Sequence, residues 1–202
     1  MNAKVNNIKN RLSLRLPQEE SLNILADLAE RLTLKKNPDI QAELAKVNTL
    51  YPTCADFERN FPSICFALAT GVGKTRLMGA FITYLYLAKG LKKFFVLAPG
   101  RTIYTKLIED FSFSQNPKYV FKGIMEFSNV KPEIITAENY NRATQLGRVG
   151  DIDINIFNIG KLNTEDRKIN DFSEYLGQSY MDYLKEQKDL ILIMDESHRY
   201  RA

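Results

Sequence analysis

A glycine-rich stretch at residues 69–75, ATGVGKT, has the composition of a loop that binds phosphate. Gly71 and Gly73 allow the backbone to curl, so that successive N–H groups can point at one polyphosphate. Lys74 can then reach the β- and γ-phosphates of a nucleotide, and the Thr75 hydroxyl can ligate Mg²⁺. The stretch predicts a site for ATP and Mg²⁺, and the residues expected to contact the nucleotide are Thr70, Gly71, Val72, Gly73, Lys74, Thr75 and Arg76.

The loop departs from the usual G-x-x-x-x-G-K-[ST] pattern at one position, because Leu68 stands where the first glycine is expected. Its surroundings nevertheless favour a phosphate loop. The apolar run at 64–70 predicts a buried strand before the loop, and the apolar stretch at 76–90 predicts a buried helix after it. The alternative interpretation is a chance glycine turn with a surface lysine.

A second group of reactive side chains lies in the segment 189–202, DLILIMDESHRYRA. A buried strand that ends in two carboxylates is expected to place Asp195 at the carboxyl edge of a sheet, beside the phosphate loop, where ligands bind in open α/β folds. Asp195 is expected to hold Mg²⁺, and Glu196 to orient and deprotonate an attacking water. The alternative is a solvated acidic strand end without a chemical role.

The elements that must position these residues alternate along the chain. Apolar runs predict further strands at 94–99, 119–124, 133–135, 153–159 and 189–195. Helices are predicted at 18–35, 76–90 and 102–111 and around 137–146 and 171–187, with a less regular polar helix and loop at 38–62. This alternation predicts an α/β fold, with a mostly parallel sheet and helices on both faces.

Composition narrows the class of protein. The 202 residues are 45% hydrophobic and 26% charged, which excludes disordered, collagen-like and coiled-coil chains. The two cysteines are too few for a disulfide scaffold, and no apolar run approaches a membrane span, so a soluble cytoplasmic protein is expected.

The charge is unevenly distributed along the chain. Residues 1–101 carry a net charge of +7 and residues 102–202 a net charge of −3. The basic half suits a phosphate-rich ligand or an ordinary basic surface.

Several segments together resemble superfamily-two helicases of the DEAD/DEAH type. Asp-Glu-Ser-His (195–198) is similar to their Asp-Glu-x-His box, with Ser197 where alanine is commonest. The resemblance implies that His198 couples the ATP site to a second motor domain. RLPQ (15–18) looks like the adenine-reading glutamine motif, which makes Gln18 a candidate for base recognition; a solvated helix-cap glutamine is the alternative.

Two further segments, VLAPGRTIYTKLIEDF (96–111) and INIFNIGKLN (154–163), look like the strands and turns that contact the nucleic-acid backbone in this superfamily. The resemblance implies sequence-independent, salt-sensitive contacts to phosphates. The alternative is a set of ordinary loop residues. The residues implied in nucleic-acid contact are Gly100, Arg101, Thr102, Lys106, Asn158 and Lys161.

Within the superfamily, the motifs look most like the restriction subunit of type III restriction–modification enzymes, from about residue 11 onward. The resemblance implies a RecA-like P-loop motor domain at 61–202, preceded by a helical segment at 1–60 that carries the glutamine motif. Expected partners are DNA, with RNA left open, a second motor domain of the same parent chain that brings arginine fingers, and a modification methyltransferase subunit. The rival functions are a non-motor P-loop NTPase, such as a switch or small-molecule kinase, and a non-catalytic fragment that binds nucleotide or DNA.

Overall fold

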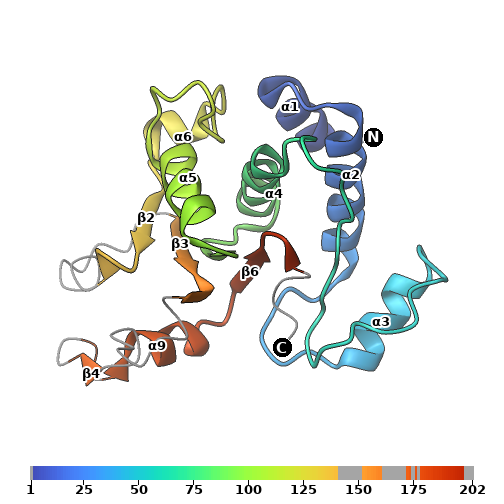
Figure 1. Ribbon diagram of the computed structural model, residues 1–202. Helices are drawn as coiled ribbons and strands as arrows, with labels where there is room; N and C mark the ends of the chain where they lie inside the picture. Colours follow the sequence, from blue (N-terminus) through green and yellow to red (C-terminus); the bar gives the residue numbers. More distant parts are fainter. Residues whose placement is uncertain (1, 141–151, 161–171, 174–175, 177, 198–202) are drawn as a thin grey trace.

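The computed structural model describes residues 2–140, 152–160, 172–173, 176 and 178–197. Helices surround one central sheet, as Figure 1 shows. The elements in chain order are α1 (Ala3–Leu12), α2 (Leu16–Arg31), α3 (Ile40–Asn48), α4 (Lys74–Lys89), β1 (Lys93–Ala98), α5 (Arg101–Ser112), α6 (Glu126–Asn129), β2 (Glu133–Thr136), β3 (Asp153–Asn158), β4 (Phe172–Ser173), β5 (Gln178–Ser179), α9 (Tyr180–Glu186) and β6 (Leu190–Met194).

The central sheet has the strand order β2-β3-β1-β6, and each of its neighbouring pairs is parallel. The last residue of β1, Ala98, pairs with Asn158 of β3, and Leu97 pairs with Met194 of β6. The strands therefore end at one edge, so that the residues that follow β1, β3 and β6 come together there. The predicted parallel sheet is confirmed.

Alternate residues of the strands point to opposite faces of the sheet. Phe94, Val96 and Ala98 of β1 lie in the larger core with α1, α2, α4 and α5, whereas Phe95 and Leu97 pack with α9 in a second core. Helices thus cover both faces, as the continuous apolar strands predicted.

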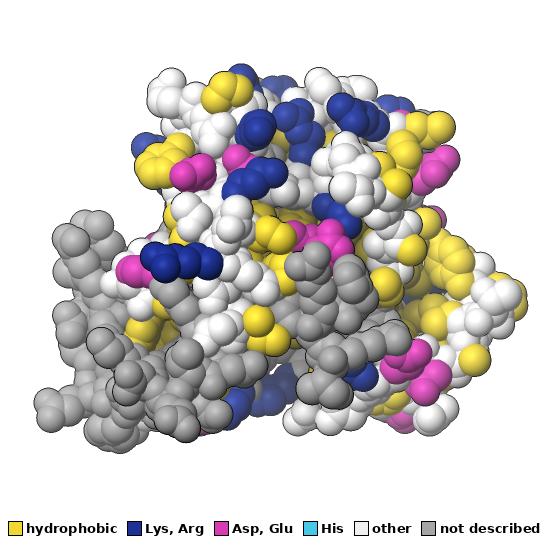
Figure 2. Space-filling view, viewed as in Figure 1, with side chains coloured by type: hydrophobic (Ala, Val, Ile, Leu, Met, Phe, Trp, Pro, Cys, Tyr) yellow, Lys and Arg dark blue, Asp and Glu magenta, His cyan; other side chains and the backbone are white. Residues whose placement is uncertain are grey.

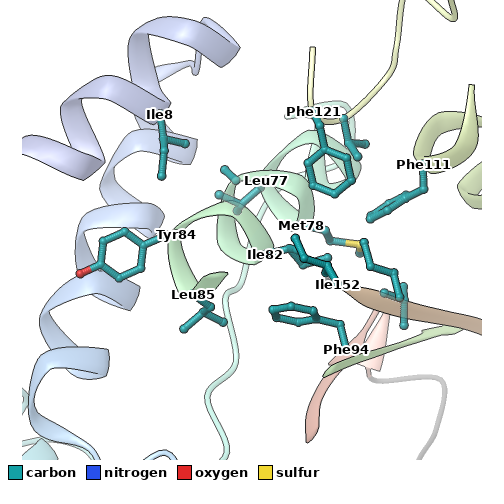
Figure 3. Packing of buried hydrophobic residues seen from close by; sticks show 14 of the residues in the cluster. Ile8, Leu77, Met78, Ile82, Tyr84, Leu85, Phe94, Phe111, Phe121 and Ile152 are labelled. Atoms are coloured by element: carbon teal, nitrogen blue, oxygen red, sulfur yellow. The ribbon is translucent and has the colours of Figure 1, made fainter. Parts of the chain in front are cut away.

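Helix α4 lies between the sheet and the two N-terminal helices (Figure 1). Figure 3 shows Ile82 directed toward Phe94 of the sheet, while Tyr84 is directed toward the N-terminal helices. Ile8 of α1 belongs to the same buried cluster as these residues. The helical segment predicted at 1–60 therefore shares its core with the sheet domain, which fixes α1 and α2 against α4.

The strand predicted at 64–70 is absent from the sheet, and this prediction was wrong. Phe66 packs on Phe81 of α4, with ring centroids 4.9 Å apart, and Leu68 packs against the main core, but Ile64 is 39% exposed. Only one side of the run is covered, so its apolar character reflects half-burial against a helix. Among the described residues, β6 consequently forms an edge of the sheet, and its Leu192 is 46% exposed.

The run at 119–124 is also not a strand. Val120, Phe121 and Ile124 are buried, but the backbone turns, with Gly123 at a φ of +85°. The run crosses α4 so closely that a Cβ at Gly79 would lie 2.7 Å from the Val120 Cβ. Burial there comes from packing on a helix rather than from strand pairing.

The predicted helices differ mainly in their bounds. The helix expected at 18–35 begins two residues earlier and ends at Arg31. Of the helix expected at 171–187, only the last part is helical among the described residues, as α9. The helix expected around 137–146 lies mostly outside the described residues, and α1 was not predicted. Within the described part of the chain, no helix has the length and apolar character needed to span a membrane.

Candidate active site

The predicted phosphate loop is a sharp backbone turn that leads into α4. Gly71 has a φ of +82° and Gly73 a φ of +94°, in the left-handed region that favours glycine. Gly73 is the N-cap of the 16-residue helix α4, so the N–H groups of the first helical turn face the loop. The N-terminus of such a helix carries partial positive charge and attracts an anion. The local geometry is therefore suited to phosphate.

The structure joins this loop to the acidic strand end. The Lys74 Nζ lies 2.6 Å from the Glu196 Oε1, although the two residues are 122 positions apart in the chain. Their side chains are 28% and 26% exposed, so a ligand from solvent can reach both. The two motifs therefore lie together. The Glu196 carboxylate pairs with the Lys74 ammonium, the group that is predicted to bind phosphate.

Asp195 is held beside this pair by the sheet. The Asp195 backbone N–H donates to the Leu97 carbonyl of β1 at 3.1 Å, which extends the β1–β6 pairing by one residue. Asp195 is only 9% exposed. Burial raises the pKa of the Asp195 carboxyl, and the negative charge of Glu196 raises it further, while Lys74 and Lys106 act in the opposite direction. Two neighbouring carboxylates of this kind favour a bound cation.

The donor set fits the Mg²⁺ that the sequence predicts. In proteins Mg²⁺ usually takes one or two carboxylates and completes its shell with substrate phosphates and water. The groups that would hold Mg²⁺ are the Asp195 carboxylate and the hydroxyl of Thr75, which lies in the first turn of α4. No group of three or more His, Cys, Asp or Glu side chains suited to a metal occurs among the described residues, so an all-protein cage is not available there.

Glu196 has an unusual backbone. Its φ is +53°, a left-handed conformation that is uncommon for a residue with a side chain. Such conformations cost about 1–3 kcal/mol and persist where the surroundings impose them, often at functional sites. The strain fits a residue whose carboxylate must leave the line of β6 and turn toward the loop. The motif predicted Glu196 in the site, but its left-handed backbone and its contact with Lys74 are tertiary features that the motif does not reveal.

The RLPQ segment also contacts the loop. Gln18 is 2% exposed, and its Nε2 donates to the Gly73 carbonyl at 2.9 Å. The Arg15 Nη1 donates to the Gly71 carbonyl at 3.3 Å. Adenine recognition by Gln18 stays a prediction, and Arg15 is a site residue that the sequence analysis missed, although it lies three positions before Gln18 in the quoted motif.

The remaining nucleotide candidates are less uniform. Thr70 is exposed and Val72 half-buried, both within the loop. The Arg76 Nη1 donates to the Leu12 carbonyl at the end of α1, at 2.8 Å, so this side chain ties α4 to α1. His198 lies outside the described residues.

The described residues among those expected to contact nucleic acid follow β1 or end β3, at the same edge of the sheet. Gly100 is the N-cap of α5, and Arg101, Thr102 and Lys106 of that helix are exposed. Asn158 is buried at the end of β3, and Lys161 lies outside the described residues. In the view of Figure 2, acidic side chains lie beside a basic one near the centre, and further Lys and Arg side chains lie over the upper part.

The parallel sheet covered by helices and the glycine loop that opens α4 define an α/β domain of the P-loop, RecA-like class. A family model described as "Type III restriction enzyme, res subunit" matches residues 11–202. The chain belongs to this family and is a helicase-like ATP-binding motor domain, as the motifs suggested. No curated protein and no solved structure gives a significant match.

Proposed function

We propose that this domain hydrolyses ATP with Mg²⁺ and couples hydrolysis to movement along DNA, as part of a type III restriction enzyme. The observation that carries the proposal is the contact of 2.6 Å between Lys74 and Glu196. It brings a cation suited to the γ-phosphate and a carboxylate suited to activating water into one solvent-accessible site. These are two of the groups that in-line attack of water on a phosphoryl group uses.

In this proposal the nucleotide phosphates replace Glu196 at the Lys74 ammonium. The released Glu196 carboxylate orients a water and takes its proton as the water attacks the γ-phosphorus. The bond from the γ-phosphorus to the β–γ bridging oxygen breaks on the opposite side, and ADP and inorganic phosphate leave. Thr75 and Asp195 would hold Mg²⁺, which supplies positive charge to the β- and γ-phosphate oxygens. His198 is the proposed link between this site and a second motor domain.

DNA is the proposed polymer at the carboxyl edge of the sheet. Arg101, Thr102 and Lys106 are exposed on the first turns of α5, close enough to the acidic site for Lys106 to influence the pKa of Asp195. A strand bound there would touch the same edge as the nucleotide, which supports coupling between the two. Gly100, Asn158 and Lys161 remain proposed contacts, and membership of the family supports a methyltransferase subunit as a further partner.

The rate of hydrolysis depends on a cation that we propose comes from a second motor domain. The transferred phosphoryl group develops charge that an arginine finger offsets, at a gain of about 10³–10⁵ in rate. The 202-residue chain is therefore expected to bind ATP but to turn it over slowly, with little response to DNA. Addition of the second motor domain should restore DNA-stimulated hydrolysis.

The test measures ATP affinity by calorimetry and phosphate release with and without DNA. Lys74→Ala should weaken ATP binding. Glu196→Gln should bind ATP at least as tightly as the wild type and should abolish the turnover that the second motor domain restores. Lys89→Ala is a matched control, because Lys89 ends the same helix and pairs with Glu30 at 2.8 Å, far along α4 from the loop. Unchanged ATP affinity in Lys74→Ala, or rapid hydrolysis by the 202-residue chain alone, would contradict the proposal.

A further inference from the structure

The N-terminal end of α2 contacts the phosphate loop at both of its glycines. The Arg15 Nη1 donates to the Gly71 carbonyl, and the Gln18 Nε2 donates to the Gly73 carbonyl. We propose that Arg15 and Gln18 are positioning residues that hold the loop in its phosphate-binding shape, so that they control affinity for the triphosphate whatever the base. This inference rests on the proposed nucleotide site.

The Gln18 amide is fixed in the orientation that this role needs. Its Oε1 accepts the backbone N–H of Arg15, the N-cap residue of α2, at 2.8 Å. The Nε2 must then face the other way, where the Gly73 carbonyl accepts from it. Because the side chain is 2% exposed, water competes little for either bond.

The approach is so close that a side chain at position 73 would displace the Gln18 amide. A Cβ at Gly73 would lie 2.7 Å from the Gln18 Nε2. Glycine has the largest backbone freedom of any residue, and both loop glycines adopt left-handed conformations, so the curled loop costs conformational entropy to maintain. Bonds from outside the loop lower that cost before a ligand arrives.

The helix that carries Gln18, α2, is itself held in place by the main core. Leu22 and Ala26 of α2 are buried in the main core together with Leu77 and Ala80 of α4, the helix that the loop begins. The loop is therefore held between a helix that continues it and a helix turn that is packed on that same helix. This arrangement pre-organises a ligand site in the sense that ordering is completed before binding.

Two roles of Gln18 make different predictions. If Gln18 only reads adenine, its loss should weaken ATP binding and leave GTP and inorganic tripolyphosphate unaffected. If it holds the loop, all three ligands should lose affinity by the same factor. A net loss of about 2- to 10-fold is expected for each hydrogen bond removed.

The experiment compares Gln18→Met and Arg15→Ala with the wild-type chain. Calorimetry gives the affinities for Mg-ATP, Mg-GTP and tripolyphosphate, and hydrogen exchange of the backbone amides at 70–73 is followed in the nucleotide-free protein. Exchange without a ligand is independent of any attraction between Arg15 and phosphate. Arg11→Ala is the matched control, because the Arg11 Nη1 donates to the Gly123 carbonyl at 3.1 Å, outside the loop.

We expect both variants to speed exchange at 70–73 and to weaken the three ligands equally, while the Arg11 variant changes neither. Loss of ATP affinity alone, with unchanged exchange in the loop, would overturn the inference and leave Gln18 as a base reader. If Gln18→Met does not fold, Arg15→Ala decides, since its side chain is exposed. A wild-type chain that binds none of the three ligands would refute the proposed function, whereas the exchange measurement would still test the support of the loop.

Discussion

Removal of the Glu196 charge is expected to strengthen ATP binding while it stops hydrolysis. In the structure the Glu196 carboxylate holds the Lys74 ammonium at 2.6 Å, so the phosphates must displace it. Glu196→Gln keeps the size of the side chain and weakens this competition. The variant should therefore bind nucleotide more tightly than the wild type, the opposite of the usual effect of a substitution in an active site.

The magnitude follows from the exposure of the pair. The side chains are 28% and 26% exposed, so solvent screens the attraction, and pairs near the surface contribute about 0.2–1 kcal/mol. We take the upper end, because both groups are partly covered, which corresponds to a gain in ATP affinity of about fivefold. The gain should shrink at high salt, since screening already weakens the pair in the wild type.

The assay is a double-mutant cycle by calorimetry with Mg-ATP. Loss of a negative charge also lowers repulsion of the phosphates, but this part of the effect persists in a Lys74→Ala background, so the cycle isolates the pair. Glu30→Gln is the control, because it breaks the equivalent pair with Lys89 at the other end of α4. If Glu196→Gln leaves ATP affinity unchanged, or raises it equally in both backgrounds, Glu196 does not compete for Lys74.

Three further predictions concern stability. Gly79→Ala should lower the free energy of unfolding in urea by about 1–3 kcal/mol, because its Cβ would lie 2.8 Å from the Val120 carbonyl oxygen. This loss should exceed the gain from the helix propensity of alanine. An unchanged free energy of unfolding would mean that the backbone at Val120 moves away without cost. Tyr180→Phe should cost about 1–3 kcal/mol, because the buried Tyr180 hydroxyl donates to the Asn155 Oδ1, and an equal midpoint for both proteins would contradict this. Burial raises the pKa of the Asp110 carboxyl above its ordinary 3.8, so the native state holds this proton more tightly than the unfolded chain does. Wild-type stability should therefore fall as pH rises from the ordinary pKa through the raised one, and Asp110→Asn should remove that fall in thermal unfolding over a pH series; parallel profiles would refute it.

Much of the fold could be predicted because its signals are local. The strands β1 and β6 are almost wholly apolar runs, β3 carries Ile154, Ile156 and Phe157 between polar residues, and the helix α4 ends at Gly90 with a φ of +68°. The helix α1 was missed although Val5, Ile8 and Leu12 recur at helical spacing and all three are buried. A short helix with polar residues on its other faces is a weak signal until its partner, α4, is known.

The runs at 64–70 and 119–124 mark the limit of the same reasoning. An apolar run predicts that side chains will be covered, but it does not say whether a strand or a helix covers them. Phe66 packs on a helix, and so does Val120, so neither run pairs with the sheet. Strand pairing depends on a neighbour that the run itself does not encode.

The sequence by itself determined the chemistry of the site, since a curled glycine loop, a lysine, a hydroxyl and two carboxylates are properties of the residues in order. The sequence also predicted that the acidic strand end lies beside the loop, but only the tertiary structure decided which side-chain atoms meet there. Lys74 reaches Glu196 across 122 positions because α4 packs on the sheet beside β6, and Gln18 reaches Gly73 across 55 because α2 packs on α4. The physical reason is that hydrogen bonds and ion pairs act over a few ångströms, so they depend on packing between segments that are far apart in the chain.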